Sequence, residues 1–282
     1  MRHTLAISTA SLLLFAAPLY AHEFWIAPLR YQAAAGDTLV VRAFVGTGFR
    51  GETKPLAARR VVRLEAQTTR RFDLRELGVN GSEDYARLIL PDAGGASVAY
   101  QSDFATIELP GPAFDAYLRL EGLEIPRLER ERTRTTTRPG RERYARCCRT
   151  WLRGTDLSRA IDPVGLALEV LPSADPTVLK RAPFRVLLRG RPLAGALVRV
   201  WNRPLDSNNR PFDVATRDSL GPVFEGRTRA DGSLTIPVAR AGEWMVSCVH
   251  MEPSESRADA DWQSLWANFT FARPAKAHAK TR

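Results

Sequence analysis

Apolar and polar positions alternate in short runs along most of the chain, a pattern typical of β-strands. Residues 38–45 are rich in β-branched and aromatic side chains and follow a turn signal at Gly36 and Asp37. Similar runs at residues 61–64 and 87–90 are separated by further glycine-containing turns. No helix of normal length fits this part of the chain. The pattern therefore predicts a first antiparallel β-sandwich of the immunoglobulin-like kind, in a domain that we place at residues 22–161.

The pattern changes between residues 113 and 153. Phe114, Tyr117 and Leu118 recur at near-helical spacing and are followed by a glycine that is suited to end a helix. Arginines and glutamates then alternate as far as a Pro-Gly pair. We expect a short helix, an arginine-rich loop and a segment at 142–152 that returns to the sheet. Because glutamates are interleaved and no aromatics alternate with the arginines, a solvated crossover is favoured over a site for a phosphate polymer.

A second run of strand-like segments occupies residues 162–273. Glycine turns such as those at 190–195 and 230–232 separate the segments and are suited to hairpins. The pattern thus predicts a mainly β chain. A C-terminal prealbumin-like or immunoglobulin-like sandwich is joined to the N-terminal sandwich by the helical, arginine-rich crossover. The polar residues 274–282 are predicted to be a disordered tail. The strands predicted for the second domain are residues 166–171, 184–188, 196–201, 223–228, 233–236, 243–251 and 264–271.

The first 21 residues have the pattern of a cleavable secretory signal. Arg2 precedes an apolar run that includes residues 12–17, and the small residue Ala21 closes the segment. Cleavage after Ala21 makes His22 the first residue of the mature chain. The apolar run is shorter than the roughly 20 residues of a membrane-spanning helix, and no later stretch is apolar for that length. We therefore expect a periplasmic protein with no transmembrane segment after signal cleavage.

The net charge of +10 and the isoelectric point near 10.1 come almost entirely from arginine. Such an excess is compatible with nucleic acid or anionic lipid as a partner. The arginines are nevertheless scattered through strand-like segments, which is typical of solvated outer faces, and an exported protein meets little nucleic acid. We therefore expect no nucleic-acid partner.

The three cysteines fit no dense disulfide framework and no CxxC or zinc-ribbon spacing. Cys147 and Cys148 are adjacent, and Cys248 lies far along the chain in an apolar segment. An exported compartment permits a bridge from Cys248 to either of the other two, and the sequence leaves that question open.

The chain has four histidines, of which His3 leaves with the signal and His278 lies in the tail. His22 and His250 remain for an ordered site. A terminal amine and an imidazole on one residue form a chelate, and a second imidazole completes a set of nitrogens that suits Ni, Co or Cu. The sequence therefore predicts a transition-metal site with His22 and His250 as ligands.

Two other readings stay open for the residues around this site. Strand alternation puts His250 on one face with Trp244 and Cys248, and a histidine at the end of an apolar strand is often structural. Asp261 is a candidate third ligand or an acceptor that orients a ligand ring. It is also suited to cap the loop before the last strand, which we favour.

Three stretches together are similar to a known family. They are residues 22–28 (HEFWIAP), residues 117–123 (YLRLEGL) with 142–146 (ERYAR), and residues 242–251 (GEWMVSCVHM) with 261–267 (DWQSLWA). These stretches resemble bacterial exported proteins of unknown function labelled NikM-like, the periplasmic components of nickel and cobalt uptake. The resemblance implies a periplasmic metal-binding or metal-uptake accessory protein that works with an uptake transporter or an outer-membrane receptor.

Two alternative functions remain. The first is a copper histidine-brace enzyme that oxidises a polysaccharide, for which Tyr31 or Phe269 are candidate axial residues. The second is a scaffold module for an outer-membrane receptor, in which both histidines are structural. No nucleophile elbow, Walker loop, dinucleotide fingerprint or HExxH motif is present, so a non-enzymatic function is favoured. Four tryptophans can line a ligand surface, but core packing is favoured for Trp244, which lies within an apolar strand.

Overall fold

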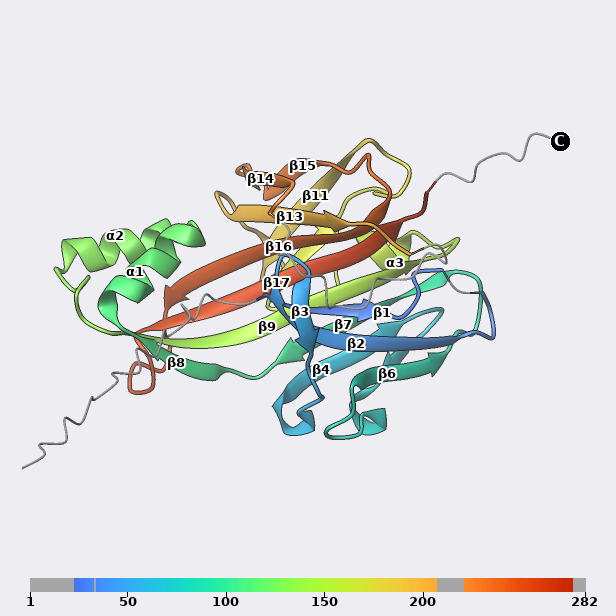
Figure 1. Cartoon of the computed structure of the whole chain (residues 1–282), viewed down its shortest axis with the longest axis horizontal. Coiled ribbons are helices and arrows are strands. Elements are labelled where there is room, and N and C mark those ends of the chain that lie inside the picture. The colour runs from blue at the N-terminus through green and yellow to red at the C-terminus, as the bar shows by residue number, and fades with distance from the viewer. Residues whose placement is uncertain (1–22, 33, 207–220, 276–282) are drawn as a thin grey trace, which may run out of the picture.

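A computed structural model of the chain describes residues 23–32, 34–206 and 221–275. Within these residues, a central sheet of nine strands is covered by a four-stranded sheet on each face (Figure 1). The prediction of a mainly β sandwich fold is confirmed. In spatial order, the central sheet contains β14 (Phe224–Arg227), β13 (Leu197–Arg203), β16 (Gly242–Pro253), β17 (Trp262–Arg273), β9 (Gly140–Arg153), β7 (Gly95–Ser102), β4 (Val61–Gln67) and β5 (Arg71–Asp73), with β8 (Ala105–Leu109) beside β9.

The two smaller sheets each come from one half of the chain. We name them the N-terminal sheet and the C-terminal sheet, and the faces of the central sheet that they cover are the N face and the C face. The N-terminal sheet contains β1 (Glu23–Pro28), β2 (Thr38–Thr47), β3 (Arg50–Thr53) and β6 (Asp84–Ile89). The C-terminal sheet contains β10 (Leu168–Pro172), β11 (Arg181–Leu188), β12 (Arg191–Pro192) and β15 (Ser233–Pro237).

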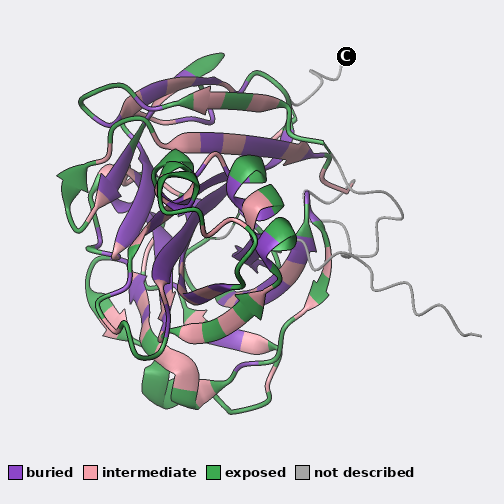
Figure 2. Ribbon diagram, turned by 90° about the vertical axis from the view of Figure 1, so that its left-hand side faces the viewer, coloured by how far each residue is buried: buried purple, intermediate pink, exposed green. Residues whose placement is uncertain are grey.

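A parallel pair joins the two predicted domains. β9 precedes the predicted boundary near residue 162 and β17 follows it, yet the two pair in parallel from Glu142 opposite Trp262 to Thr150 opposite Thr270. Both strands are buried along most of their length, as expected for strands that are covered on both faces. Figure 2 shows that strands in the interior of the molecule are mostly buried. The two predicted sandwiches therefore share the central sheet.

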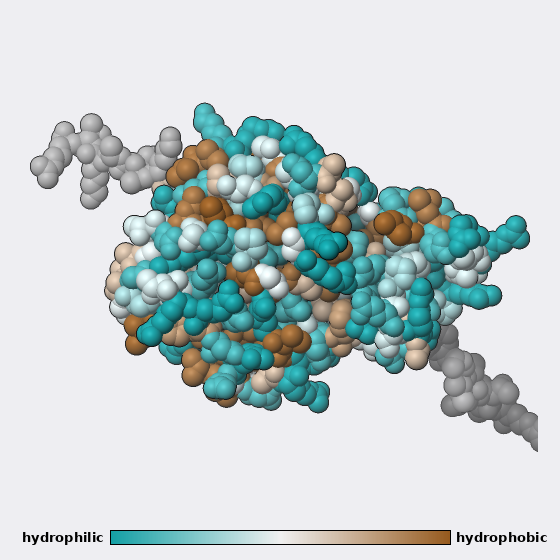
Figure 3. All heavy atoms as spheres, turned by 180° about the vertical axis from the view of Figure 1, so that it is seen from behind, coloured by the Kyte–Doolittle hydropathy of each residue, from teal (hydrophilic) through white to brown (hydrophobic). Residues whose placement is uncertain are grey.

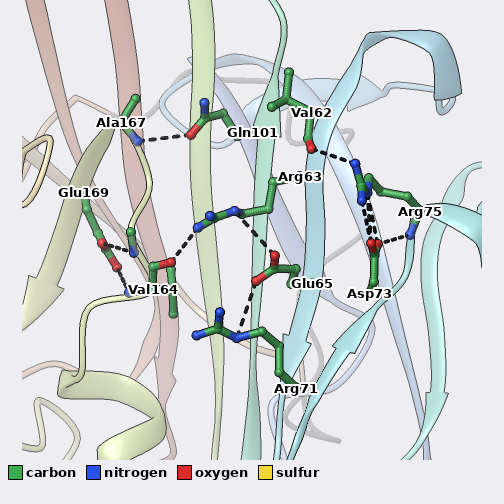
Figure 4. Close-up of polar contacts among 11 residues, drawn as sticks. Val62, Arg63, Glu65, Arg71, Asp73, Arg75, Gln101, Val164, Ala167 and Glu169 are labelled. Carbon is green, nitrogen blue, oxygen red and sulfur yellow. Dashed lines mark hydrogen bonds and ion pairs between the residues drawn. The ribbon is translucent and has the colours of Figure 1, made fainter.

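The segment at the predicted domain boundary is bound to its surroundings. Arg63 on β4 donates to the carbonyl of Val164 at 2.5 Å, and the side-chain oxygen of Gln101 accepts from the backbone N–H of Ala167 at 3.0 Å (Figure 4). The carboxylate of Glu169 accepts from the N–H groups of Val164 and Gly165. These bonds fix the connection between the two halves.

Alternation along the central strands separates two cores. Cys147 lies in the core under the C-terminal sheet, and Cys148 lies in the core under the N-terminal sheet. Cys248 shares the first core with Cys147, and all three are free, buried thiols. The bridge that the sequence left open is therefore not formed in this structure.

The crossover contains two helices where the sequence predicted one. α1 (Gly111–Leu120) is the expected helix, but the arginine-rich run that we predicted as a loop forms α2 (Glu124–Arg132). Arg127 pairs with both Glu124 and Glu131 at helical spacing, and each such pair stabilises a helix by a few tenths of a kcal/mol. Pro126 stands in the first turn of α2, where proline is tolerated, so the sequence did contain a signal for this helix.

The remaining helical turns are short. They are α3 (Ser158–Ile161), η1 (Ala58–Arg60) and η2 (Arg75–Leu77). Among the residues that the structure describes, no helix has the length and apolar character needed to cross a membrane. Hydrophilic side chains cover most of the face seen in Figure 3, with small hydrophobic groups between them.

Strand positions agree closely with the pattern. The runs predicted at 38–45, 184–188, 233–236 and 264–271 lie within β2, β11, β15 and β17. The run predicted at 166–171 was placed two residues early, since β10 begins at Leu168. Of the predicted tail, the residues after 275 lie outside the described part of the chain.

Candidate functional site

A row of polar side chains crosses the N face of the central sheet. Arg199 on β13 lies opposite Ser247 on β16, which lies opposite Asn268 on β17. Their neighbours along each strand, such as Val198 and Cys248, belong to the core on the C face, so alternation places these three side chains on the N face. We name Arg199, Ser247 and Asn268 the polar row.

Apolar clusters border the polar row on both sides. On one side, Trp201 and Met245 pack under the N-terminal sheet. On the other side, Val249 and Trp266 pack under α1. The polar row therefore lies between the N-terminal sheet and the helical hairpin formed by α1 and α2. Figure 1 shows these two elements at different places along the central strands.

β1 is held above this face by side chains of the central sheet. Asn268 Nδ2 donates to the carbonyl of Phe24 at 2.5 Å, and Thr270 Oγ1 donates to the carbonyl of Ile26 at 2.7 Å. Cys148 Sγ donates to the same Phe24 carbonyl at 3.0 Å. These bonds satisfy carbonyls of β1, and they fix the first described residue, Glu23, next to the polar row.

Two glutamates reach the polar row from opposite sides. Glu121, which directly follows α1, accepts a hydrogen bond from Arg199 Nη1 at 2.7 Å. Glu23 at the start of β1 is 7% exposed. Burial raises the pKa of Glu23 to about 7, and the charge of Glu121 adds to this rise, whereas Arg199 and backbone N–H groups act against it. A carboxyl group shifted by burial and by a neighbouring charge is characteristic of functional sites.

Three polar atoms around the polar row are buried without a hydrogen-bond partner. They are Glu23 Oε2, Asn268 Oδ1 and Arg146 Nη1. The guanidinium of Arg146 lies over the rings of Trp266 and Tyr144, at 4.8 and 5.0 Å from their centroids. Buried polar atoms in folded proteins are nearly always paired, so two unpaired acceptors and one unpaired donor mark this region as a candidate binding site.

Glu142 forms a separate hydrogen-bonded network under α1. Tyr117 donates to its Oε1 at 3.1 Å, Ser264 Oγ also donates to Oε1, and Trp266 Nε1 donates to Ser264 Oγ at 3.0 Å. Burial raises the pKa of Glu142 to about 7. Because this network joins α1 to the central sheet and its acceptor is satisfied, its main role is structural.

His250 lies on the opposite face from the polar row. Its cross-strand partner Leu265 belongs to the core on the C face, and so does Cys248, as alternation predicted. Its Nε2 is 3.7 Å from Glu252, which itself pairs with Arg189. Burial lowers the pKa of His250. The ring borders a small pocket of about 140 Å³ between α2 and the turn near residue 195.

Asp261 is engaged by Arg141. The guanidinium donates to its carboxylate at 2.7 Å, and this bond lowers the pKa of Asp261. The backbone carbonyl of Asp261 accepts from Ser254 at 3.0 Å, which closes the loop between β16 and β17. The side chain of Asp261 is thus paired with β9, and only its backbone bonds to the loop. In the described part of the chain, no three His, Cys, Asp or Glu residues are grouped so as to hold a metal ion, and His22 lies outside that part.

The aromatic residues considered from the sequence are packed in the interior. Tyr31 donates to Glu243 at 2.8 Å on the N face, whereas Phe269 is buried on the C face. The two candidate axial residues of a copper enzyme therefore lie on opposite faces. The tryptophans that were weighed as a ligand surface are all buried, which agrees with core packing: Trp25, Trp244, Trp262 and Trp266.

A cavity larger than the one beside His250 lies elsewhere, where β9 and β17 separate beyond Thr150 and Thr270. It has a volume of about 500 Å³ and is lined by Trp151, Leu157 and Ala272 among others. Arg153 at its rim is paired with Asp175 at 3.2 Å. Among the residues that the structure describes, its lining includes none of the polar row and neither His250 nor Asp261, so its volume does not identify it as the metal site.

Comparison with known proteins gives a family and no function. A search of curated proteins finds no match. Among solved structures, the D0-D1 domain of intimin is 11% identical with a TM-score of 0.19, covering 89% of this chain and 97% of that chain. Three N-terminal domains of the highly immunogenic outer capsid protein of bacteriophage RB49 are 12% identical with a TM-score of 0.18, covering 88% and 59%. Such TM-scores establish no common fold. The family model of a domain of unknown function, DUF4198, matches residues 19–252, and the chain therefore belongs to this family.

Proposed function

We propose that the protein is an exported, periplasmic protein that binds a transition-metal ion, Ni, Co or Cu, through His22 after its signal segment has been removed. The α-amine and the imidazole of a terminal histidine are both nitrogen ligands that suit these metals. The resemblance to periplasmic components of nickel and cobalt uptake supports the same function. In that role the protein delivers the ion to an uptake transporter or an outer-membrane receptor.

The observation that carries this proposal is the position of Glu23. His22 is joined by one peptide bond to a residue whose side chain β1 fixes beside the polar row. The two unpaired acceptors there, Glu23 Oε2 and Asn268 Oδ1, fit a cation, because a buried oxygen without a donor is stabilised by a positive charge. The described residues next to His22 thus have the chemistry that a metal site needs.

The choice of the second ligand differs between the sequence and the geometry of the fold. The sequence offers His250, but the side chains of Glu23 and His250 lie on opposite faces of the central sheet. The joint site of His22 and His250 stays a prediction. Asn268 of the polar row, which is on the same face as Glu23 and has an unpaired Oδ1, is the better candidate for a further ligand.

Metal titration of the processed protein tests the proposal. The protein is exported with its own signal, its N-terminus is established by mass spectrometry, and it is titrated calorimetrically with Ni(II), Co(II) and Cu(II). A matched variant that carries an additional Met before His22 is expected to bind at least about tenfold more weakly, because the amine chelate is lost. Equal affinities of the two proteins would refute a site at the terminal histidine.

The variant His250→Ala then decides about the second ligand. If His250 completes the site, this variant loses affinity to a similar degree. If the polar row supplies the remaining ligands, the affinity is unchanged. Thermal unfolding of each variant verifies that differences in affinity come from the site and not from loss of the fold.

A further inference from the structure

We infer that the cavity between the ends of β9 and β17 binds a small organic acid, whose carboxylate pairs with the guanidinium of Arg153 while its apolar part occupies the cavity. The volume of about 500 Å³ is within the range of small-molecule sites. The cavity lies at the end of the central strands opposite α1 and α2 (Figure 1). It is separate from the proposed metal site.

The cavity lies where two neighbouring strands of the central sheet separate. β9 and β17 pair as far as Thr150 opposite Thr270, yet the strands continue to Arg153 and Arg273. Over these last residues, β9 remains paired with β7, and β17 remains paired with β16. The edges of β9 and β17 that face each other there are not joined by strand pairing, so a gap opens within the sheet.

Each strand end is anchored to a different part of the fold. The guanidinium of Arg273 donates to the carbonyl of Val238 at 3.2 Å, which holds the end of β17 beside the C-terminal sheet. The segment after β9 bonds instead to the loop before β7, where the N–H of Thr155 donates to the carbonyl of Ala93 at 3.1 Å. Because closing the gap would break one of these anchors, the cavity is preformed.

Arg153 at the rim is held in place with two donors available. Its Nε donates to Asp175 at 3.2 Å, and the other oxygen of Asp175 accepts from the N–H and the hydroxyl of Thr177. Among the residues that the structure describes, none accepts a hydrogen bond from Nη1 or Nη2 of Arg153. A guanidinium that is oriented through Nε and has both terminal nitrogens free is suited to bind a carboxylate through two bonds.

The charges at this end of the sheet favour an anion. β13, β17 and β9 run in the same direction and end in Arg203, Arg273 and Arg153. Arg203 and Arg153 each pair with one carboxylate, whereas no carboxylate in the described part of the chain pairs with Arg273. One positive charge therefore remains uncompensated beside the cavity, and the net charge of +10 adds a general attraction for anions.

Apolar side chains on the cavity lining favour an organic anion over an inorganic one. Leu157 follows β9, Leu205 follows β13, and Ala272 belongs to β17. An apolar group in the cavity removes these surfaces from water, which an inorganic ion does not do. Trp151 also contributes to the lining, and its Nε1 has no hydrogen-bond partner among the described residues. Its indole N–H is therefore a suitable reporter of a bound ligand.

Three proteins test the inference: wild type, Arg153→Gln and the control Arg60→Gln. Arg60 also donates through Nε to an aspartate, and its side chain is 35% exposed, but it does not line the cavity. The probes are benzoate, phenylacetate and hexanoate, each beside its own uncharged amide, and sulfate as an inorganic anion. Affinities are measured by calorimetry near neutral pH. Heteronuclear NMR follows the indole N–H of Trp151, which is assigned by its absence from Trp151→Phe.

We expect at least one carboxylate to bind wild type with a Kd of about 1 mM or below. Its amide, and the variant Arg153→Gln, should bind about tenfold more weakly or worse, while Arg60→Gln resembles wild type. The resonance of Trp151 should shift with bound carboxylate, and that of Trp266, which lies under α1 at the other end of the sheet, should not.

Three outcomes would overturn the inference. They are no saturation by any of the carboxylates up to about 10 mM, equal affinities of wild type and Arg153→Gln, and an affinity for sulfate as high as that for the best carboxylate. Where Arg153→Gln lowers the melting temperature, Arg153→Lys is used as a second variant. It keeps the charge but loses the two-bond geometry, so an intermediate loss of affinity is expected. Because no metal takes part, the result is independent of the metal titration.

Discussion

Two groups of buried charges on opposite faces of the central sheet differ in how completely they are bonded. On the C face, Arg149 is fully buried and pairs with Glu169 at 3.1 Å. All three guanidinium nitrogens of Arg149 donate hydrogen bonds, to Ser97, to Glu169 and to backbone carbonyls. The carboxylate of Glu169 also accepts hydrogen bonds from two backbone N–H groups. On the N face, Glu23 and Asn268 each retain an unpaired oxygen.

The difference separates a structural network from a candidate site. Satisfied charges such as Arg149 and Glu169 hold the two halves of the chain together and need no further partner. Buried polar groups without a hydrogen-bond partner reduce stability unless a ligand supplies that partner. An unpaired atom alone is insufficient evidence, because Arg203 also has two unpaired nitrogens while its guanidinium is bound to Glu243 and lies 4.6 Å from the ring centroid of Phe49. The region of the polar row differs from Arg203 because its unpaired atoms include two oxygens, Glu23 Oε2 and Asn268 Oδ1, and because Glu23 is adjacent to residue 22 in the chain.

The strongest test of this comparison is Arg149→Met. Methionine fills a similar volume, but Glu169 then remains as a buried charge without its cation. We expect the free energy of unfolding to fall by about 3–5 kcal/mol, measured by urea denaturation. The double variant Arg149→Met with Glu169→Gln should recover part of this loss. A loss below about 1 kcal/mol would show that the C-face pair is not the structural network that its bonds indicate.

The second test uses the pH dependence of Glu142. Its pKa is about 7 in the fold and 4.5 in its reference state, so the folded protein binds the additional proton between these values. The contribution of Glu142 to stability is therefore fully present below pH 4.5, decreases as the pH rises and is lost above pH 7. The total change is at most about 3 kcal/mol.

Urea denaturation of wild type and Glu142→Gln between pH 4 and 8 measures this contribution. We expect the unfolding free energy of Glu142→Gln, relative to wild type, to rise with pH over this range, because the variant has no carboxyl group to ionise. Other groups that titrate in both proteins cancel in the difference. A difference that is constant with pH would show that Glu142 is ionised in the fold, and it would make this network resemble the C-face pair.

The smallest expected effect is that of Asp261→Asn. The ion pair with Arg141 is more than a third exposed at both side chains, and exposed pairs contribute about 0.2–1 kcal/mol. We expect a loss of stability within that range and an unchanged affinity for Ni(II). A tenfold loss of metal affinity would instead identify Asp261 as a ligand and would move the candidate site away from the polar row.

The positions of most strands could be predicted from the sequence, because alternation with a period of two is a local property. The same rule correctly separated Trp244, Val246 and Cys248 from Met245 on β16. The helix α2 was missed because its dense charges were interpreted as a solvated loop, although its Glu–Arg spacing and Pro126 indicated a helix. In that case the local information was present and was given too little weight.

The candidate site could be predicted only in part. The sequence drew attention to the junction at His22, but it did not identify Glu23 or Asn268. A weak signal existed in β17, where Ser264, Asn268 and Thr270 are polar at alternating positions. In an isolated strand that pattern predicts a solvated face. Here the face is covered by β1 and by the helical hairpin, so the same residues become buried hydrogen-bonding groups.

The sequence alone therefore determined most of the strands, their faces and the cysteine and histidine inventory, since these depend on residues close together in the chain. Tertiary structure decided that β9 and β17 pair in parallel, that His250 and Glu23 lie on opposite faces, and that the polar row lies between two apolar covers. Such outcomes depend on contacts between residues more than 100 positions apart, as in the bonds from Asn268 and Thr270 to β1. No local pattern encodes which distant strand will cover a given face.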